Sequence, residues 1–327
     1  MIDLTRRQAL AAGSVLAAAT MLPRFARAAA TPVRLTSVKF GSVSWLIDTI
    51  RAEGLDKKNG LNLQVIEVAN NPAAPIALLS GAADVIVSDW TWALRQRAKG
   101  YDFKFAPYSV ALGSVMVPKG SKIKSLVDLE GKKIGVAGTG IDKSWILLRA
   151  YSRKLIGKDI ADFAEPVFGA APLVTEEFRN GRLDAVLNFW TYAARLKAGG
   201  AREMLSMSDV VKGLGVSPTP ALVGFIWSEK EVLDKAVPVD VLLSTVADAN
   251  AVLAKSDAAW KRLRPLIKPA SDAELVAIRD YYRSGITGSW GPAETAAAEK
   301  LTNLLIKFGD AELVGDGTRF DQKLFHT

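Results

Sequence analysis

Five short segments place hydroxyl, amide, carboxyl or lysine side chains where an expected strand ends and an expected helix begins. They cover residues 41–45, 70–71, 88–91, 138–144 and 188–191. A helix N-terminus presents unpaired backbone N–H groups and a partial positive charge, which favours a sulfonate, a carboxylate or a similar oxyanion. Lys143 adds a full positive charge to one segment. The pattern predicts a small-molecule binding site, although each hydroxyl taken alone also fits simple helix capping.

Four of these junctions carry a tryptophan, whose indole ring supplies apolar area, stacking and attraction for cations. The alternative for each ring is a core position at the start of an amphipathic helix. Asp89 and Asp142 would repel an anion, so either they cap helices away from the ligand or the ligand also carries a positive group. A zwitterion or a polar heterocycle satisfies both conditions. The predicted ligand-binding residues are Ser44, Trp45, Asn71, Asp89, Trp90, Thr91, Thr139, Asp142, Ser144, Trp145, Phe189, Trp190 and Thr191.

The residue inventory argues against catalysis and against cofactors. The sequence has no cysteine and a single histidine, His326, next to the C-terminal residue, where we expect a frayed chain. The usual ligands of zinc, iron and copper and the usual nucleophile systems are therefore missing. The Gly-Thr-Gly segment at 138–140 lacks the third glycine of a dinucleotide fingerprint and the Gly-Lys-Ser of a phosphate loop. We predict no cofactor, no metal and no enzymatic activity, with carboxylate-only catalysis left open by composition.

Alternating strand and helix patterns position these segments, which is typical of parallel α/β construction. Strands are expected at 33–39, 61–68, 84–88, 103–108 and 113–117, with helices over 42–58, 72–80 and 90–99. From about Leu222 the pattern becomes predominantly helical, with helix starts at 228–229, 256–257, 271–272 and 291–292. We expect this helical tail to pack on the first of two lobes.

A shift of 100 residues superposes two parts of the sequence without a gap. Among the identical pairs, Pro72, Gly81, Asp84, Trp90, Thr91, Ala93, Ala98 and Gly100 meet Pro172, Gly181, Asp184, Trp190, Thr191, Ala193, Ala198 and Gly200. The same shift places Ser44-Trp45 on Ser144-Trp145. The identities fall where strands pass into helices and predict a structural repeat. Part of them is accounted for by the residue types that any strand-helix unit uses at its turns and caps.

The first 30 residues predict an export signal. A twin arginine, Arg6-Arg7, precedes an uncharged Ala-rich stretch and small residues suited to cleavage near Ala28. This apolar stretch is too short for a membrane span. We expect export by the twin-arginine pathway, a soluble periplasmic location and, without cysteine, no lipid anchor. Lys and Arg are spread among acids and not clustered, so the formal charge of +8 does not indicate a nucleic-acid partner.

Four segments carry a resemblance to a known family. They are residues 52–63, 79–85, 123–136 and 180–185. With them the chain resembles the nitrate, taurine and alkanesulfonate solute-binding proteins of ABC importers, which include thiamine-pyrimidine binding relatives. The resemblance implies a two-lobed type II periplasmic binding protein fold, with a mainly parallel sheet flanked by helices in each lobe. In that family the cleft residues come from the loops after the strands. The richness in tryptophan here argues against a ligand as small as nitrate.

The resemblance also implies a lobe division and a mechanism. We expect residues 1–30 to form the signal, 31–108 with 221–327 the first lobe, and 109–220 the second. Crossings at 107–109 and 217–220 would serve as hinges. Ligand contacting both lobes would stabilise the closed form of a monomer, which a membrane permease with its ATPase subunits then recognises. The lead interpretation is a sulfonate- or taurine-like ligand; the alternatives are a periplasmic sensor module on the same fold or a pyrimidine-precursor-related enzyme.

Overall fold

The computed structural model describes residues 31–38, 41–69, 73–288, 290–308, 315 and 317–326. The predicted signal at 1–30, the predicted ligand contact Asn71 and the helix start at Pro72 lie outside the described residues. The strands and helices of the structure belong to a compact unit that begins at Thr31.

Ten strands form the sheets. They are β1 (Pro32–Val38), β2 (Asn62–Val68), β3 (Ile86–Asp89), β4 (Phe103–Ser109), β5 (Ser114–Val117), β6 (Lys133–Ala137), β7 (Glu165–Gly169), β8 (Ala185–Asn188), β9 (Arg202–Ser206) and β10 (Val223–Ser228). The strands predicted before residue 120 are all present, with ends that differ by one or two residues. The strand β10 was not predicted, because its apolar residues stand directly before a run of helical pattern.

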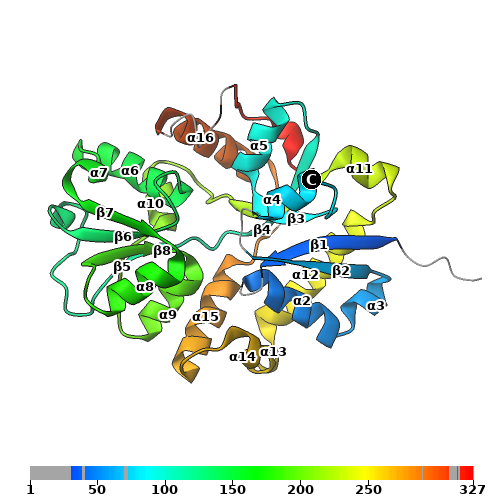
Figure 1. Cartoon of the computed structure of the whole chain (residues 1–327), viewed down its shortest axis with the longest axis horizontal. Helices are drawn as coiled ribbons and strands as arrows, with labels where there is room; N and C mark the ends of the chain where they lie inside the picture. Colours follow the sequence, from blue (N-terminus) through cyan, green and yellow to red (C-terminus); the bar gives the residue numbers. More distant parts are fainter. Residues whose placement is uncertain are drawn as a thin grey trace, which may run out of the picture. The chain divides into compact units, whose positions relative to one another are not determined.

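Two sheets with the same strand order define two lobes (Figure 1). In the first lobe β1 pairs in parallel with β2, a parallel bridge from Leu35 to Val85 links β1 to the start of β3, and β10 lies antiparallel between β3 and β4. In the second lobe the order is β7-β6-β8-β5-β9, and β5 is the antiparallel strand. The first lobe thus receives β10 from beyond the second lobe, whose five strands follow one another in the chain, and the expected two-lobed fold is confirmed. The predicted boundaries near 108 and 220 remain predictions.

Fifteen helices with described bounds accompany the strands. They are α2 (Ser42–Ala52), α3 (Leu55–Asn59), α4 (Ala73–Leu79), α5 (Trp90–Ala98), α6 (Lys143–Ile156), α7 (Ile160–Phe163), α8 (Ala171–Arg179), α9 (Trp190–Ala198), α10 (Met207–Gly213), α11 (Glu229–Asp234), α12 (Val239–Lys255), α13 (Asp257–Arg262), α14 (Arg264–Ile267), α15 (Asp272–Gly285) and α16 (Pro292–Phe308). Short single turns of tighter helix occur at Val127–Leu129 and Gln322–Leu324. The helix expected over 42–58 is divided into two, because Gly54 adopts φ +64, a left-handed conformation that ends α2.

The repeat predicted from the 100-residue shift corresponds to equivalent elements. Helices α5 and α9 begin at Trp90 and Trp190 and end at Ala98 and Ala198. The strands before them, β3 and β8, occupy the same place in their sheets, next to the antiparallel strand. The two stretches therefore build the same strand-helix unit, one in each lobe.

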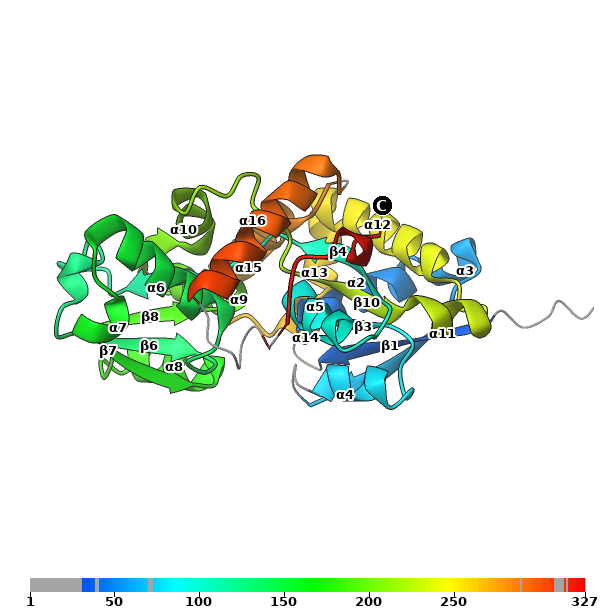
Figure 2. The same cartoon turned by 90° about the horizontal axis from the view of Figure 1, so that it is seen from above.

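The helical tail, yellow to red in Figure 2, contacts both lobes. The helix starts expected at Glu229, Asp257, Asp272 and Pro292 are all present, and serine side chains cap the first three. Helix α12 packs on α2 and α3 of the first lobe, as expected. In addition, α15 packs on α9 and α16 packs on α6, so the tail also reaches the second lobe.

Candidate functional site

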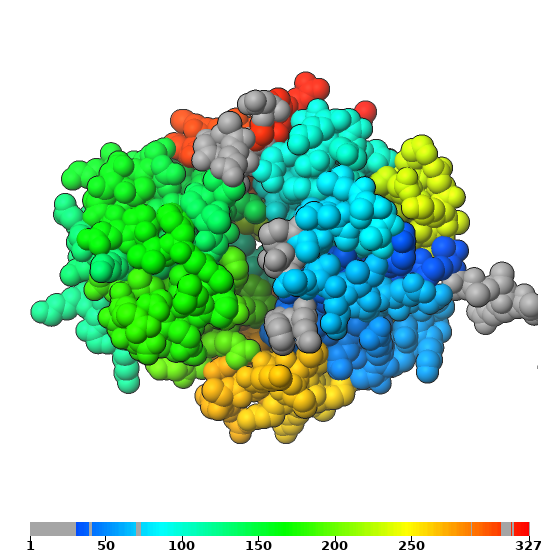
Figure 3. Space-filling view, viewed as in Figure 1, coloured from blue at the N-terminus to red at the C-terminus, as the bar shows by residue number. Residues whose placement is uncertain are grey.

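The carboxyl ends of the parallel strands in the two lobes lie toward each other. The Nζ atom of Lys143, at the start of α6, lies 3.1 Å from Oδ2 of Asp89, at the end of β3. The ring centroids of Trp45 on α2 and Trp190 on α9 are 6.0 Å apart at an interplanar angle of 90°. Four of the five predicted junctions therefore meet across the lobe boundary, where Figure 3 shows a groove. This is the edge at which α/β sheets bind ligands.

The junction before α2 has no side-chain cap. Gly41 is the N-cap residue, so the alternative that the hydroxyls of this segment, on Ser42 and Ser44, cap the helix is wrong. The Ser44 hydroxyl donates to the Gly41 carbonyl at 2.6 Å, and Ser42 accepts from the Tyr108 hydroxyl at 3.0 Å. Trp45 is buried in the first-lobe core, with only its edge-on contact to Trp190 reaching the other lobe.

The junction before α5 is capped by a carboxylate. Asp89 accepts from the backbone N–H of Trp92 at 2.8 Å and from the hydroxyl of Thr91, which confirms its predicted capping role. Trp90 is 0% exposed, and its indole N–H donates to the Ala221 carbonyl at 2.9 Å. In this conformation Trp90 takes the core role that the sequence left open as the alternative.

The junction before α6 repeats that arrangement in the second lobe. Asp142 accepts from the backbone N–H of Ser144 at 2.9 Å and caps the helix. Thr139 is exposed, and its carbonyl accepts from the Asp142 N–H at 2.9 Å. Trp145 is 2% exposed and packs edge-on against Phe168, so it too is a core residue here.

The junction before α9 differs from the Asp-capped junctions before α5 and α6. Its N-cap residue is Phe189, which offers no capping side chain, while the Asn188 amide oxygen accepts the Phe189 N–H at 2.9 Å. Trp190 and Thr191 are partly exposed and Phe189 is exposed. This junction therefore presents more side-chain surface at the lobe boundary than the junction before α5.

Asp89 of the first lobe and Lys143 of the second lobe form an ion pair in the site. Burial would raise the pKa of Asp89, but Lys143, Thr91 and the Trp92 N–H together hold that pKa below its ordinary value. Burial would lower the pKa of Lys143, but Asp89 and Asp142 raise it. Burial raises the pKa of Asp142, and its neighbours offset only part of this effect. Asp89 and Lys143 are thus both charged at neutral pH, and the pair joins the lobes.

One model of a protein family, described as NMT1/THI5 like, matches residues 51–217 of the chain. The matched segment covers half of the sequence and includes three of the four tryptophan junctions. The chain belongs to the NMT1/THI5-like family. The resemblance expected from the sequence is thereby confirmed at the level of the family.

Curated relatives match this NMT1/THI5-like protein over a shorter stretch. The "Putative thiamine biosynthesis protein" of Haemophilus influenzae is 31% identical over 110 residues, which are 33% of this chain and 35% of that protein. The "Probable histidine-binding protein" of Neisseria gonorrhoeae is 35% identical over 113 residues, 34% of this chain and 38% of that protein. The chain therefore matches little more than a third of the length of these relatives.

Solved structures match nearly the whole fold. The aliphatic sulphonate binding protein SsuA from Escherichia coli has a TM-score of 0.72 at 17% identity, covering 90% of this chain and 92% of that one. The alkanesulfonate-binding protein SsuA from Xanthomonas axonopodis pv. citri bound to MOPS has 0.66 at 19%, covering 88% and 95%. The desulfurization enzyme DSZB has 0.61 at 15%, covering 89% and 95%. At these identities the likeness shows the periplasmic-binding-protein fold.

Further contacts across the lobe boundary were not predicted from the sequence. Arg195 of α9 forms an ion pair with Glu274 of α15 and donates to the Ile267 carbonyl at 2.8 Å. Glu203 of β9 accepts from the hydroxyl of Tyr281 on α15 at 2.5 Å and, within the second lobe, from the Ser114 hydroxyl at 2.7 Å. None of these residues stands in a motif, because the contacts join segments up to 79 residues apart in the chain.

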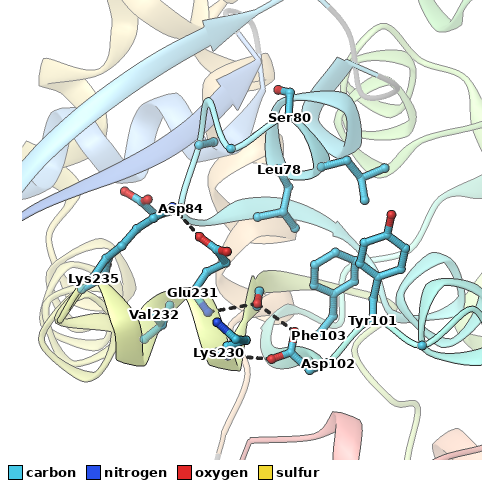
Figure 4. Close-up of a pocket in the computed structure, with 16 residues that line it drawn as sticks. Leu78, Ser80, Asp84, Tyr101, Asp102, Phe103, Lys230, Glu231, Val232 and Lys235 are labelled. Carbon is cyan, nitrogen blue, oxygen red and sulfur yellow. Dashed lines mark hydrogen bonds and ion pairs between the residues drawn. The ribbon is translucent and has the colours of Figure 1, made fainter.

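The NMT1/THI5-like chain also contains a cavity of about 580 Å³ away from the lobe boundary (Figure 4). It lies at the opposite edge of the first-lobe sheet, between the end of α4, the start of β4 and α11. Two of its carboxylates already have partners: Asp102 accepts from the Ser228 hydroxyl at 2.8 Å and from the Lys230 backbone N–H at 2.6 Å, and Glu231 pairs with Lys235. The sequence reasoning did not identify this cavity.

The described ranges show neither a metal-binding cluster nor a membrane-spanning helix. Within them no group of three or more His, Asp or Glu residues is arranged to hold a metal ion. Over the same residues no helix is long and apolar enough to span a membrane. The expectation that the chain is frayed at His326 is wrong. The His326 backbone N–H donates to the Phe105 carbonyl at 2.9 Å, and its ring lies beside Trp227 in the first lobe.

Proposed function

We propose that this protein is the solute-binding component of an ABC importer, which captures a small organic anion, zwitterion or heterocycle between its lobes without chemical change. A sulfonate- or taurine-like molecule is the lead ligand. The observation that carries the proposal is the pair of facing sheet edges, joined at Lys143–Asp89 and Trp45–Trp190, in a chain with the fold of the sulfonate-binding proteins.

The ligand contacts we propose are the exposed and partly exposed members of the predicted set, together with Asn71, which lies outside the described residues. Trp45, Trp90 and Trp145 then serve by packing beneath the site, as their burial supports. The proposed contacts are Ser44, Asn71, Asp89, Thr91, Thr139, Asp142, Ser144, Phe189, Trp190 and Thr191. The uncapped starts of α2 and α9 are better suited to an anionic group than the Asp-capped starts of α5 and α6, because a capping carboxylate repels an anion.

The proposed cycle is a shift between open and closed lobe arrangements, with hinges at 107–109 and 217–220. The proposed partners are a membrane permease and its ATPase subunits, and the proposed state is a monomer exported to the periplasm by the twin-arginine pathway. A same-fold sensor module would show the same ligand binding but would be recovered with a receptor and not with a permease.

A thermal-shift screen tests the proposal. Purified protein is heated with sulfonates, amino-sulfonates, carboxylates and pyrimidines, and a true ligand at 100 times its Kd adds about 2.7 kcal/mol to the unfolding free energy. Trp190→Ala, at the lobe boundary, should abolish the shift, whereas Lys230→Ala, on the exposed face of α11, should keep it. A panel without any stabilising compound would contradict the proposal.

The fold is shared with a desulfurization enzyme, so the screen needs a chemical readout as well. Each stabilising compound is incubated with the protein and recovered, and we expect it unchanged. Release of sulfite or any other product would favour the enzyme alternative over transport.

A further inference from the structure

Helix α16 lies between the two lobes and is attached to both of them. Figure 1 and Figure 2 place it between α6 of the second lobe and α5 of the first. Its place in the helical tail predicted packing on the first lobe. Its start and its body instead contact different lobes, and the two attachments differ in strength.

The start of α16 is held by aromatic rings of the first lobe. Trp290, two residues before the helix, stacks on Phe325 with ring centroids 4.8 Å apart at 12° and lies edge-on to Phe105 of β4 at 6.0 Å. Phe325 in turn packs edge-on against Phe105 and against Trp90 of α5. Trp290 remains partly exposed, so its docking place lies at the edge of this core.

Hydrogen bonds fix Trp290 to the first turn of the helix. Its indole N–H donates to the Thr295 hydroxyl at 2.9 Å, and that hydroxyl donates to the Gly291 carbonyl at 2.9 Å. The Glu294 carboxylate accepts from the Gly291 backbone N–H at 2.9 Å, as in a capping box. Because the ring is tied to the helix in this way, a movement of α16 carries Trp290 with it.

The body of α16 packs on α6 of the second lobe. Buried residues of both helices belong to one hydrophobic cluster, and four of those on α16 are at most 4% exposed: Ala297, Ala298, Leu301 and Leu305. Near the end of α16, the Arg153 guanidinium of α6 lies 5.9 Å from the centre of the Phe308 ring. This attachment buries more apolar side chains than the single, partly exposed ring of Trp290, so it is the stronger of the two.

We propose that α16 is a strap whose body stays with the second lobe and whose Trp290 docks on Phe325 and Phe105 only when the lobes are together. This inference rests on the proposed function, because it adds a contact that regulates the proposed lobe movement. A contact made in one arrangement alone shifts the population toward that arrangement. Loss of the Trp290 ring should therefore favour separated lobes and leave each lobe folded.

Spin labels test the strap, since a chain without cysteine accepts them at chosen positions. One label replaces Asn303, which is exposed on α16. The second replaces either Leu233 on α11 of the first lobe, 74% exposed, or Leu173 on α8 of the second lobe, 56% exposed. Double electron–electron resonance then measures the distance between the labels in protein without added solute.

Trp290→Ala should increase the population with a longer distance from α16 to the first lobe and leave the distance from α16 to the second lobe unchanged. Two aromatic contacts of this kind correspond to about a tenfold change in the ratio of the two populations. Thr295→Val, which removes the hydrogen bond to the indole, should give a smaller change of the same kind. Tyr101→Ala removes a first-lobe ring, 46% exposed and stacked on Phe103, and is the matched control that should change neither distance.

Far-UV circular dichroism checks that each variant is folded, and Thr295→Val carries the test if Trp290→Ala is not. Unchanged distances in the folded variants, a longer distance from α16 to the second lobe, or an equal change in Tyr101→Ala would overturn the inference. The proposed function would stand in each case, because the thermal-shift screen tests it by ligand binding. A failed screen would in turn leave the measured distances valid.

Discussion

The helices α5 and α9 begin with the same Trp-Thr pair, 100 residues apart, yet their first residues have different surroundings. Trp90 is fully buried, with Ala221 accepting its indole N–H and Phe325 of the tail packed edge-on against its ring. Trp190 remains partly exposed and contacts Trp45 and Tyr282 across the lobe boundary. The repeated sequence thus sets the strand-helix unit, while the partner that covers the unit decides whether its tryptophan is core or boundary.

The residues before the two tryptophans, Asp89 and Phe189, also differ in how they end the preceding loop. Asp89 caps α5 and pairs with Lys143, whereas Phe189 leaves α9 without a side-chain cap. The start of α5 is therefore capped by a side chain, whereas at the start of α9 the N–H groups of Tyr192 and Ala193 donate to the backbone carbonyl of Phe189. The two copies of the repeat therefore share the Trp-Thr pair and differ in the residue that precedes it.

The largest expected effect is a difference in the unfolding free energy lost when each of the two tryptophans is replaced by alanine. Trp90→Ala removes a buried indole and its hydrogen bond and should lower the unfolding free energy by about 3–5 kcal/mol. Trp190→Ala removes a partly exposed ring and should cost about 1–2 kcal/mol. Urea unfolding followed by far-UV circular dichroism measures both. Equal losses would show that the α9 junction is as much a core as the α5 junction.

An intermediate effect separates the two capping carboxylates. Because the pKa of Asp89 is lowered, its ionised form stabilises the fold above the ordinary carboxyl pKa of about 4, and this stability is lost as pH falls through the folded value. The pKa of Asp142 is raised, so its contribution is present at low pH and lost as pH rises through the folded value.

Asparagine variants should change the unfolding free energy in opposite directions at the two positions. Asparagine still caps a helix, so such a variant removes the charge of the carboxylate and keeps the cap. At pH 7, Asp89→Asn should lower the unfolding free energy by about 2 kcal/mol because Lys143 loses its partner, while Asp142→Asn should raise it. Both differences should shrink toward pH 3. Urea melts across this range supply the measurement, and a loss in both variants at pH 7 would contradict the assignment.

The smallest expected effect concerns the threonines that follow. Thr91 donates to the Asp89 carboxylate, whereas Thr191 follows Phe189 and has no such carboxylate at that place. Thr91→Ala should therefore cost about 1 kcal/mol and Thr191→Ala less than about 0.5 kcal/mol. Thermal unfolding in parallel checks the order, which a larger loss at Thr191 would reverse.

Sequence patterns predicted the parts of this fold that depend on local chemistry. Helix starts at Glu229, Asp257 and Asp272 followed from serine caps, and the bounds of α5 followed from Asp89 and Gly100. The family resemblance came from segments such as 123–136, which carry turn and strand signals together.

Burial and long-range pairing were not predictable in the same way. Ser44 is a good capping residue, but Gly41 occupies the N-cap position and the serine hydroxyl bonds back to it. Trp90 and Trp190 both begin a helix with a Trp-Thr pair, and their environments differ through residues distant in the chain: Ala221 and Phe325 around Trp90, and Trp45 and Tyr282 beside Trp190. The strand β10 completes a sheet begun over a hundred residues earlier, and no local pattern reports such a partner.

The ring cluster at the lobe boundary has an optical consequence. Trp45, Trp190 and Trp260 lie around Tyr282, with Trp45 about midway between the other two at centroid distances of 6.0 and 6.1 Å. Indoles this close exchange excitation energy and influence one another's emission. A change in the separation of the lobes would therefore alter the intrinsic fluorescence, and a single Trp190→Phe substitution would show how much of that signal the second lobe supplies.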